Sequence, residues 1–332
     1  MADALGLVVL GTILALVFDF GNGFNDAANS IATVVATRVL TLQQAVLLAA
    51  GANFVAAFVF GVAVAKTIGT GIIDSSIVTP ALVIGGLAGS IIWVYATTFF
   101  GLPISASHAL IGGLIGAGIS ASGFGILNWS GISTILLFIF LAPLVGLIGA
   151  VVFSIIVLRL AWNQKPRIVN EYFKKLQLVS VSIYSLGHGA NDAQKTMGII
   201  ALLLFSGGLL GSEFHVPFWV VLLSHGTIAA GTLAGGWKVV KTMGTRLTNL
   251  KPMQGFCAES SGALTIIFCS IAGIPVSTTH VICGSIAGVG FARRASAVRW
   301  FLARKIVWAW ILTIPASAIM GFVGFKVLNA VL

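Results

Sequence analysis

Charged side chains are scarce in this sequence. Lys, Arg, Asp and Glu together make up 8% of its 332 residues, whereas a soluble globular domain carries about 25%. Hydrophobic residues make up 58%, and the mean hydropathy is +1.08. A soluble chain of this length could not bury so much apolar surface, so the composition predicts an integral membrane protein.

Cysteines are few and a nucleotide-binding loop is missing. Cys257, Cys269 and Cys283 lie in apolar segments without CxxC or histidine spacing, so we expect them to be packing residues that form neither a disulfide nor a metal centre. The sequence has no GxxxxGK[ST] loop, which argues against transport driven by its own ATP hydrolysis. We expect no cofactor apart from the transported ions.

Acidic residues are outnumbered by basic ones, and the net charge is +10. Such a balance can indicate a nucleic-acid partner. Lys and Arg also collect in the cytoplasmic loops of membrane proteins, however, and this is the better explanation here. We therefore expect contact with membrane lipid and no nucleic-acid partner.

Long apolar runs dominate the chain. They cover residues 44–65, 80–100, 131–158, 216–236 and 306–325. They lack the two-residue alternation of a membrane β-barrel, so we expect helices. The first apolar stretch lacks a basic leader and is expected to be a span, not a cleaved signal. Because one span needs roughly 20 apolar residues, the length predicts an all-α integral membrane protein with about 10–12 transmembrane elements.

Two polar motifs each occur twice, in the same order. FDFGNGFNDAANSIAT (18–33) resembles YSLGHGANDAQKTMGI (184–199), and GLPISASHALIGGLIGAG (101–118) resembles GIPVSTTHVICGSIAGVG (273–290). A weaker pair is KTIGT and KTMGT. These pairs indicate an internal duplication of nearly the whole chain.

The duplication divides the chain into three parts. We place repeat 1 at 1–158, a basic linker at 159–175 and repeat 2 at 176–332. Equivalent loops differ in charge: 119–130 has no Lys or Arg, whereas 291–305 has five. By the positive-inside rule they lie on opposite sides of the membrane, so the topology of the two repeats is inverted. The basic linker then lies in the cytoplasm, both termini lie outside, and the protein resides in the inner (plasma) membrane.

Inverted repeats are typical of secondary transporters, whose broken or re-entrant helices meet at a site near the membrane midplane. Each repeat here has one polar stripe on an apolar helix. The stripes are Asn22, Asn25, Asp26 and Asn29 in repeat 1, and His188, Asn191, Asp192 and Lys195 in repeat 2. Their i, i+3, i+4, i+7 spacing puts each stripe on one helix face.

The chemistry of the stripes suits a coupling cation. Each stripe begins within a Gly-x-Gly, which allows a helix break that frees backbone carbonyls. Carboxylate and amide oxygens with such carbonyls suit Na⁺ or H⁺. The alternative is a structural polar clamp between helices. Lys195 either contacts the substrate or only pairs with Asp192.

The second motif predicts two helix starts. Ser105 or Ser277 can cap the helix after each Pro turn. Ser107 in one half, and Thr278 and Thr279 in the other, add hydroxyls beside free N–H groups and a positive dipole end. Two such starts converging from opposite sides would bind a tetrahedral oxyanion. The alternative is ordinary capping.

Four further residues are candidates for supporting roles. His108 and His280 either titrate with the substrate or fix their turns by hydrogen bonding, and we favour the turns. Glu259 is a buried acid that suits a second cation or proton site. Asp19 lies beside the first stripe and either joins the cation site or lines a solvated entrance.

These motifs resemble the signatures of the inorganic phosphate transporter family. GNGFNDAANS and GHGANDAQK resemble its twin G-x-N-D segments, and GLPISASH and GIPVSTTH resemble its paired P-x-S-x-[ST]-H segments. The resemblance covers nearly the whole chain and implies symport of phosphate with Na⁺ or H⁺ by a homodimer. Some relatives carry metal–phosphate complexes or sulfate.

The resemblance assigns roles by position. It implies a phosphate site formed by Ser105, Ser107, Ser277, Thr278, Thr279, Asn25 and Asn191. Together with the stripe pattern it implies cation sites formed by Asn22, Asn25, Asp26, Asn29, Asn191, Asp192 and Glu259. Two residues depart from the family pattern. Asn53 stands where many eukaryotic members have an acid, and Ala106 replaces a frequent hydroxyl residue.

A cation-coupled phosphate symporter is the leading hypothesis. Sulfate is the first alternative, but it cannot donate a hydrogen bond to a buried carboxylate at neutral pH, whereas phosphate can. An intramembrane hydrolase using Ser277 and His280 lacks an acid to orient the histidine and a G-x-S-x-G elbow. A passive anion channel would be opposed by its own buried acids. The residues do not decide whether Na⁺ or H⁺ is the coupling cation, or whether a metal accompanies phosphate.

Overall fold

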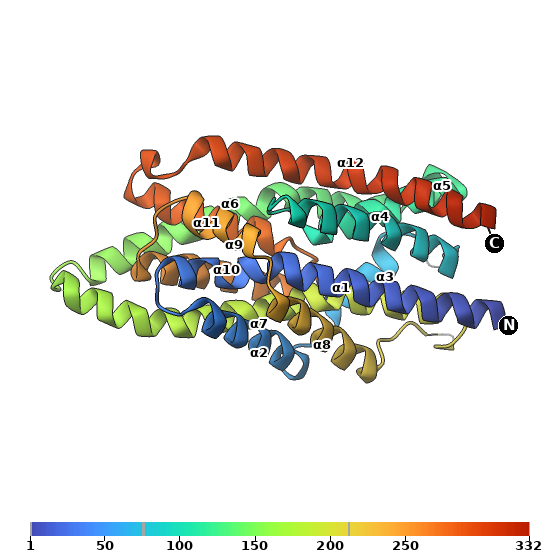
Figure 1. Ribbon diagram of the computed structural model, residues 1–332, viewed down its shortest axis with the longest axis horizontal. Coiled ribbons are helices and arrows are strands. Elements are labelled where there is room, and N and C mark those ends of the chain that lie inside the picture. The colour runs from blue at the N-terminus through green and yellow to red at the C-terminus, as the bar shows by residue number, and fades with distance from the viewer. Residues whose placement is uncertain (1, 75–76, 212, 332) are drawn as a thin grey trace.

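The computed structural model describes residues 2–74, 77–211 and 213–331, which fold into a long helical bundle (Figure 1). Its α-helices are α1 (Ala2–Ala36), α2 (Leu42–Val55), α3 (Ala63–Gly71), α4 (Pro80–Phe99), α5 (Ala106–Ser122), α6 (Trp129–Leu160), α7 (Pro166–Ser206), α8 (Phe218–Ala234), α9 (Trp237–Arg246), α10 (Pro252–Ile271), α11 (Thr278–Arg293) and α12 (Trp300–Val331). Three short 3₁₀ turns accompany them at Ala56–Phe58, Phe124–Ile126 and Ala295–Ala297. Within these ranges there is no β-strand, so the predicted all-α class is confirmed.

Several helices are suited to a membrane. Four of them, α1, α4, α6 and α12, are long and apolar enough to cross it, and two bent pairs, α2 with α3 and α8 with α9, bring the number up to six. The outer faces of α6 and α12 leave apolar side chains exposed, such as Phe140 at 69% and Ile319 at 67%. This surface suits lipid, and the multi-pass membrane fold is confirmed.

The order of the helices in the first half returns in the second. Each half has a long helix, a bent pair, an apolar helix, a short helix with an Ser N-cap and a last long helix. The long first helix of each half packs against the bent pair of the other half: α1 contacts α8 and α9, while α7 contacts α2 and α3. Likewise α5 packs on α12, and α11 on α6. The halves are therefore intertwined rather than side by side.

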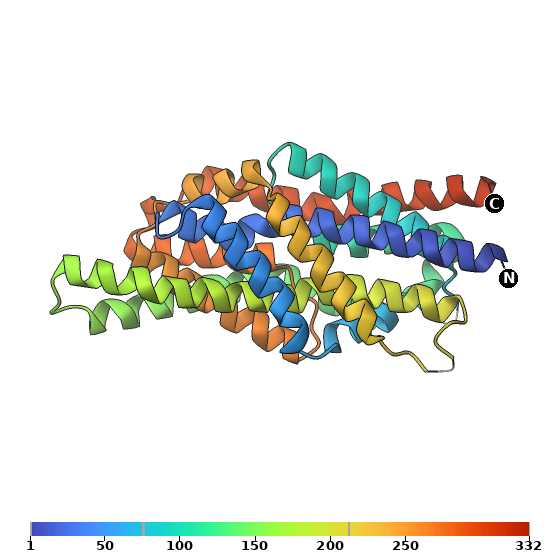
Figure 2. The same ribbon diagram turned by 60° about the horizontal axis from the view of Figure 1, so that its bottom comes forward.

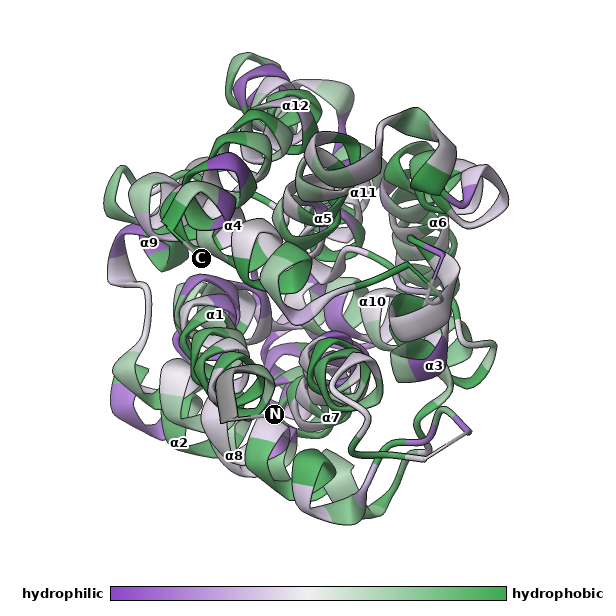
Figure 3. Cartoon of the chain, turned by 90° about the vertical axis from the view of Figure 1, so that its right-hand side faces the viewer, coloured by the Kyte–Doolittle hydropathy of each residue, from purple (hydrophilic) through white to green (hydrophobic). Residues whose placement is uncertain are grey.

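Equivalent helices run in opposite directions. α1 starts at the end of the bundle that holds both termini, whereas α7 starts at the other end, after the turn that joins it to α6 (Figure 1). α2 and α8 cross the long helices obliquely (Figure 2). Viewed end-on, hydrophilic segments lie between α1, α7 and α10, with hydrophobic segments around them (Figure 3).

The predicted helix breaks at the Gly-x-Gly motifs are wrong. α1 and α7 continue through them without interruption. The bends lie instead between α2 and α3, at 82°, and between α8 and α9, at 76°. In the motifs glycine permits close packing: a Cβ on Gly23 would lie 2.2 Å from the Ile228 carbonyl oxygen, and one on Gly189 would lie 2.7 Å from the Asn53 backbone. The two contacts are equivalent between the halves.

Candidate functional site

The two short helices begin beside the centre of the bundle. Ser105 caps α5 by accepting a hydrogen bond from the His108 N–H at 3.2 Å, and Ser277 caps α11 in the same way with His280, at 3.3 Å. Both predicted caps are thus present. The Thr279 hydroxyl, in the first turn of α11, donates to the carbonyl of Ile104, next to the cap of α5, over 3.1 Å. The two helix starts therefore lie against each other.

Two buried carboxylates lie beside these helix starts. Asp26 is on α1 and Asp192 on α7, and His188 Nε2 lies 3.1 Å from Asp192 Oδ2 and 3.9 Å from Asp26 Oδ2. The Thr278 hydroxyl donates to Asp192 over 2.9 Å and to Asp26 over 3.4 Å, and the Thr279 hydroxyl reaches Asp26 over 3.3 Å. The acids of the two polar stripes and the hydroxyls of α11 therefore form one cluster.

This cluster has the dimensions of a cation site. One ligand atom from each of Asp26, His188 and Asp192 lies within 4.8 Å of the other two. All three residues are at most 2% exposed. A carboxylate in such surroundings needs a compensating positive charge, because desolvation of an unpaired ion is costly.

Lys195 supplies one such charge. Its Nζ donates to Asp192 Oδ1 over 2.5 Å, to the Ser107 hydroxyl over 2.5 Å and to the Val276 carbonyl over 2.7 Å. The residue is 1% exposed. The expected pairing with Asp192 is present, and contact with the substrate stays a prediction. Through these hydrogen bonds Lys195 also connects α7 to the starts of α5 and α11.

The stripe asparagines have paired roles. Asn25 Nδ2 donates to the Thr98 hydroxyl over 2.6 Å, and its equivalent, Asn191, donates to the Ser270 hydroxyl over 3.1 Å. The Oδ1 atoms of both asparagines are buried and have no hydrogen-bond partner among the described residues. These two oxygens are therefore available as ligands.

Asn22 and Asn29 complete the stripe on α1. Asn29 Nδ2 donates to Thr279 over 2.9 Å and to Thr278 over 3.3 Å, while its Oδ1 has no partner within the described part of the chain. Neither polar atom of the Asn22 side chain is hydrogen-bonded there, although Asn22 is only 1% exposed. The α1 side of the cluster is thus rich in uncharged oxygen atoms.

Glu259 forms a second polar cluster where α10 meets α1 and α7. Its carboxylate accepts hydrogen bonds from Thr33 at 2.6 Å, Gln177 at 2.8 Å and Ser180 at 2.5 Å, and it is fully buried. Thr33 lies seven residues after Asp26, or about 10 Å along the helix. The acid is therefore held by three neutral donors, away from the central cluster.

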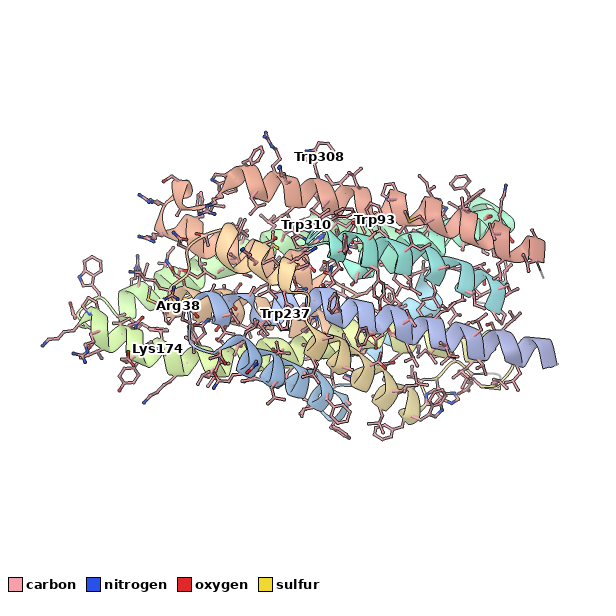
Figure 4. All side chains as sticks on the ribbon, in the orientation of Figure 1. Arg38, Trp93, Lys174, Trp237, Trp308 and Trp310 are labelled. Carbon is pink, nitrogen blue, oxygen red and sulfur yellow. The ribbon has the colours of Figure 1, made fainter. Side chains whose placement is uncertain are left out.

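The remaining candidates differ from expectation. Asp19 does not line a solvated entrance, because it is buried and accepts a hydrogen bond from Thr196 at 2.8 Å. The His108 and His280 rings do not fix their turns: they contact each other edge-on with centroids 4.7 Å apart. The His280 ring stacks on Trp310, which lies on the inner side of α12 (Figure 4). Among the described residues, Nδ1 of His108 and both ring nitrogens of His280 have no hydrogen-bond partner.

Comparison with known proteins decides the family. The model of the phosphate transporter family matches residues 22–321. The chain belongs to the phosphate transporter family. A "Probable low-affinity inorganic phosphate transporter" of Rhizobium meliloti (strain 1021) is 56% identical over 93% of this chain and 92% of its own. One of Bacillus subtilis (strain 168) is 38% identical over 98% of both chains.

A solved structure has the same fold. The chain described as "The sodium-dependent phosphate transporter" superposes with a TM-score of 0.88 at 28% identity, covering 98% of this chain and 100% of that one. The relatives are named as transporters, so the family is one of transporters and not of enzymes. The resemblance drawn from the motifs is confirmed.

Several hydrogen-bond and ion-pair partners of the candidate site residues could not be identified from the sequence. The sequence indicates His188 only as part of a stripe, although its Nε2 atom lies between the two acids, 3.1 Å from Asp192 and 3.9 Å from Asp26. Thr98 and Ser270, which anchor the stripe asparagines, carry no motif. Gln177 and Ser180 come from the same helix as the second stripe, about two to three turns before it, and their polar character in an apolar segment is the available signal.

Proposed function

We propose that this protein carries inorganic phosphate across the membrane by symport with a cation, Na⁺ or H⁺, through alternating access. One observation carries the proposal: hydroxyls at the start of α11 donate to two buried carboxylates from α1 and α7, and Lys195 joins the start of α5 to one of these carboxylates. Helix starts favour an anion and carboxylates favour a cation. The two kinds of site adjoin, so each ion would neutralise the field of the other.

The phosphate site is proposed at the two helix starts. Ser105, Ser107, Ser277, Thr278 and Thr279 would contact the anion, with Asn25 and Asn191 at the margin. Phosphate fits better than sulfate, because it can donate a hydrogen bond to a carboxylate such as Asp26 while its other oxygens accept.

The coupling cation is proposed to bind at the stripes. Asp26 and Asp192 would contribute charge, and Asn22, Asn25, Asn29 and Asn191 would contribute neutral oxygens. Glu259 would form a further cation or proton site. The imidazole of His188 also suits a divalent ion, so a metal–phosphate complex is the second candidate substrate.

We further propose inverted repeats at 1–158 and 176–332, with linker 159–175 in the cytoplasm and both termini outside the inner membrane. The opposite directions of α1 and α7 support this assignment. The exposed apolar faces of α6 and α12 would contact lipid, and the family resemblance adds a homodimer. Crosslinking in native membranes would test the dimer.

Uptake into proteoliposomes tests the function. Purified protein is reconstituted and labelled phosphate is offered under a Na⁺ gradient alone, a pH gradient alone, or either gradient with excess sulfate. We expect accumulation with one gradient and no inhibition by sulfate. Removal of divalent ions with a chelator separates free phosphate from a metal–phosphate complex. Absence of accumulation under both gradients would overturn the proposal.

A further inference from the structure

The two polar stripes differ at their ends. At the positions where α1 has the amides Asn22 and Asn29, α7 has the bases His188 and Lys195. The residues between them, Asn and Asp, are the same in both stripes. The duplication therefore presents two related sites, one with neutral ligands and one with basic side chains.

Lys195 occupies its site as a metal cation would. Its ammonium is surrounded by a carboxylate oxygen of Asp192, a hydroxyl oxygen of Ser107 and a carbonyl oxygen of Val276, all within 2.7 Å. Oxygen atoms of these three types are also the ligands of hard cations. Asp192 therefore has a positive charge attached to the protein beside it.

Asp26 has no lysine equivalent to Lys195 in its stripe, where residue 29 is Asn. Its carboxylate contacts the hydroxyls of Thr278 and Thr279 at 3.4 and 3.3 Å, and His188 at 3.9 Å. No lysine or arginine of the described chain pairs with it. Near it in the stripe lie the unpartnered Oδ1 atoms of Asn25 and Asn29. The α1 side offers oxygen ligands but no fixed cation.

We propose that Lys195 is a tethered cation that replaces one mobile coupling cation on the α7 side, and that the mobile cation binds on the α1 side beside Asp26. This rests on the proposed symport. Asp192 then stays neutralised throughout the cycle, whereas Asp26 requires an ion in order to be compensated. The transporter would move one positive charge fewer per phosphate than one with an amide at both positions.

The charge carried per phosphate tests this in proteoliposomes. It is obtained from the membrane potential at which net phosphate flux stops, and it does not depend on whether the cation is Na⁺ or H⁺. Lys195→Asn places at this position the residue type that the other stripe has at Asn29. We expect this variant to carry one more positive charge per phosphate. Lys195→Arg keeps the tethered charge and should behave as the native protein does.

A binding measurement accompanies the transport measurement. Thermal stability of the purified protein without phosphate is compared in NaCl and in choline chloride. We expect Na⁺ to stabilise Lys195→Asn more than it stabilises the native protein. The reciprocal variant Asn29→Lys should carry one charge fewer and lose stabilisation by Na⁺, which keeps a test available if Lys195→Asn does not fold.

Two results would overturn the proposal. One is an unchanged charge per phosphate in Lys195→Asn and Asn29→Lys. The other is a weaker phosphate affinity of Lys195→Asn with no change in charge or in stabilisation by Na⁺, which would make Lys195 a ligand of the anion. Failure of the native protein to accumulate phosphate would instead refute the proposed symport, and the stabilisation measurement would still report on the cation site.

Discussion

Asp26 and Asp192 are equivalent in the duplication but differ in their surroundings. Asp192 has Lys195 at 2.5 Å and His188 at 3.1 Å. Asp26 accepts only long hydrogen bonds from hydroxyls and lies 3.9 Å from His188. Removing one partner of a buried ion pair leaves an uncompensated charge, which is more costly than removing the pair. The same substitution should therefore have different effects at the two positions.

We expect Asp192→Asn to lower the free energy of unfolding by about 3 kcal/mol, because it leaves the Lys195 ammonium buried without its carboxylate. Asp26→Asn should unfold near the native temperature while losing cation-driven uptake. Thermal unfolding in detergent, followed by tryptophan fluorescence, compares the two variants. The double variant Asp192→Asn/Lys195→Met should recover stability. Equal melting temperatures for the two single variants would contradict this account.

Glu259 provides a second test at the residue scale. Glu259→Gln keeps the size of the side chain but removes the charge held by Thr33, Gln177 and Ser180. We expect uptake to fall about tenfold or more, since losing an ionised acceptor costs about 1.5–3 kcal/mol. The matched control is Glu171→Gln, at an exposed ion pair with Lys174, which should transport normally. Normal uptake by Glu259→Gln would remove this acid from the proposed cation sites.

Much of this site could be predicted from the sequence, because the duplicated motifs name the acids, the caps and the hydroxyls. The local pairing of Lys195 with Asp192 could be predicted too, but the partners from distant parts of the chain could not. Glu259 receives its hydrogen bonds from residues 226, 82 and 79 positions away. Lys195 reaches Ser107 across 88 positions. Such pairs depend on how helices pack, and no local spacing indicates them.

At the scale of the helices, glycine has two possible uses that the sequence does not separate. A Gly-x-Gly in an apolar run allows either a break or the close approach of another backbone. The backbone that packs against the glycine determines which use applies. Gly189 faces the Asn53 backbone, and Gly23 faces the Ile228 carbonyl. Long-range packing therefore explains why α1 and α7 continue where a break was predicted.

Gly189→Ala should separate α7 from α2. Its Cβ would lie 2.7 Å from backbone atoms of Asn53, which cannot rotate away as a side chain can. We expect a loss of about 1–3 kcal/mol, as for other overpacked sites. Gly51→Ala on α2 is the control, since nothing lies within 4 Å of the added Cβ. Thermal unfolding should separate the two variants, and equal stability would show that α2 moves freely away from α7.

At the scale of the molecule, basic side chains gather at one end of the bundle. Arg38 and Lys174 lie at the end where α6 turns into α7, and both termini lie at the opposite end (Figures 1 and 4). The positive-inside rule predicts that the basic end faces the cytoplasm. The loop charges and the arrangement of the helices therefore predict the same orientation in the membrane.

Cysteine labelling tests that orientation. The three native cysteines are buried, so an impermeant maleimide should label them little in intact spheroplasts. Gln164→Cys lies in the exposed turn between α6 and α7, and Glu213→Cys lies in the exposed loop between α7 and α8, at the other end. We expect Glu213→Cys to be labelled in intact spheroplasts and Gln164→Cys only after permeabilisation, because a Lys- and Arg-rich end is retained in the cytoplasm. Labelling of both after permeabilisation is the control for reactivity. The reverse pattern would place the termini in the cytoplasm and would invert the assignment of the two repeats to the membrane faces.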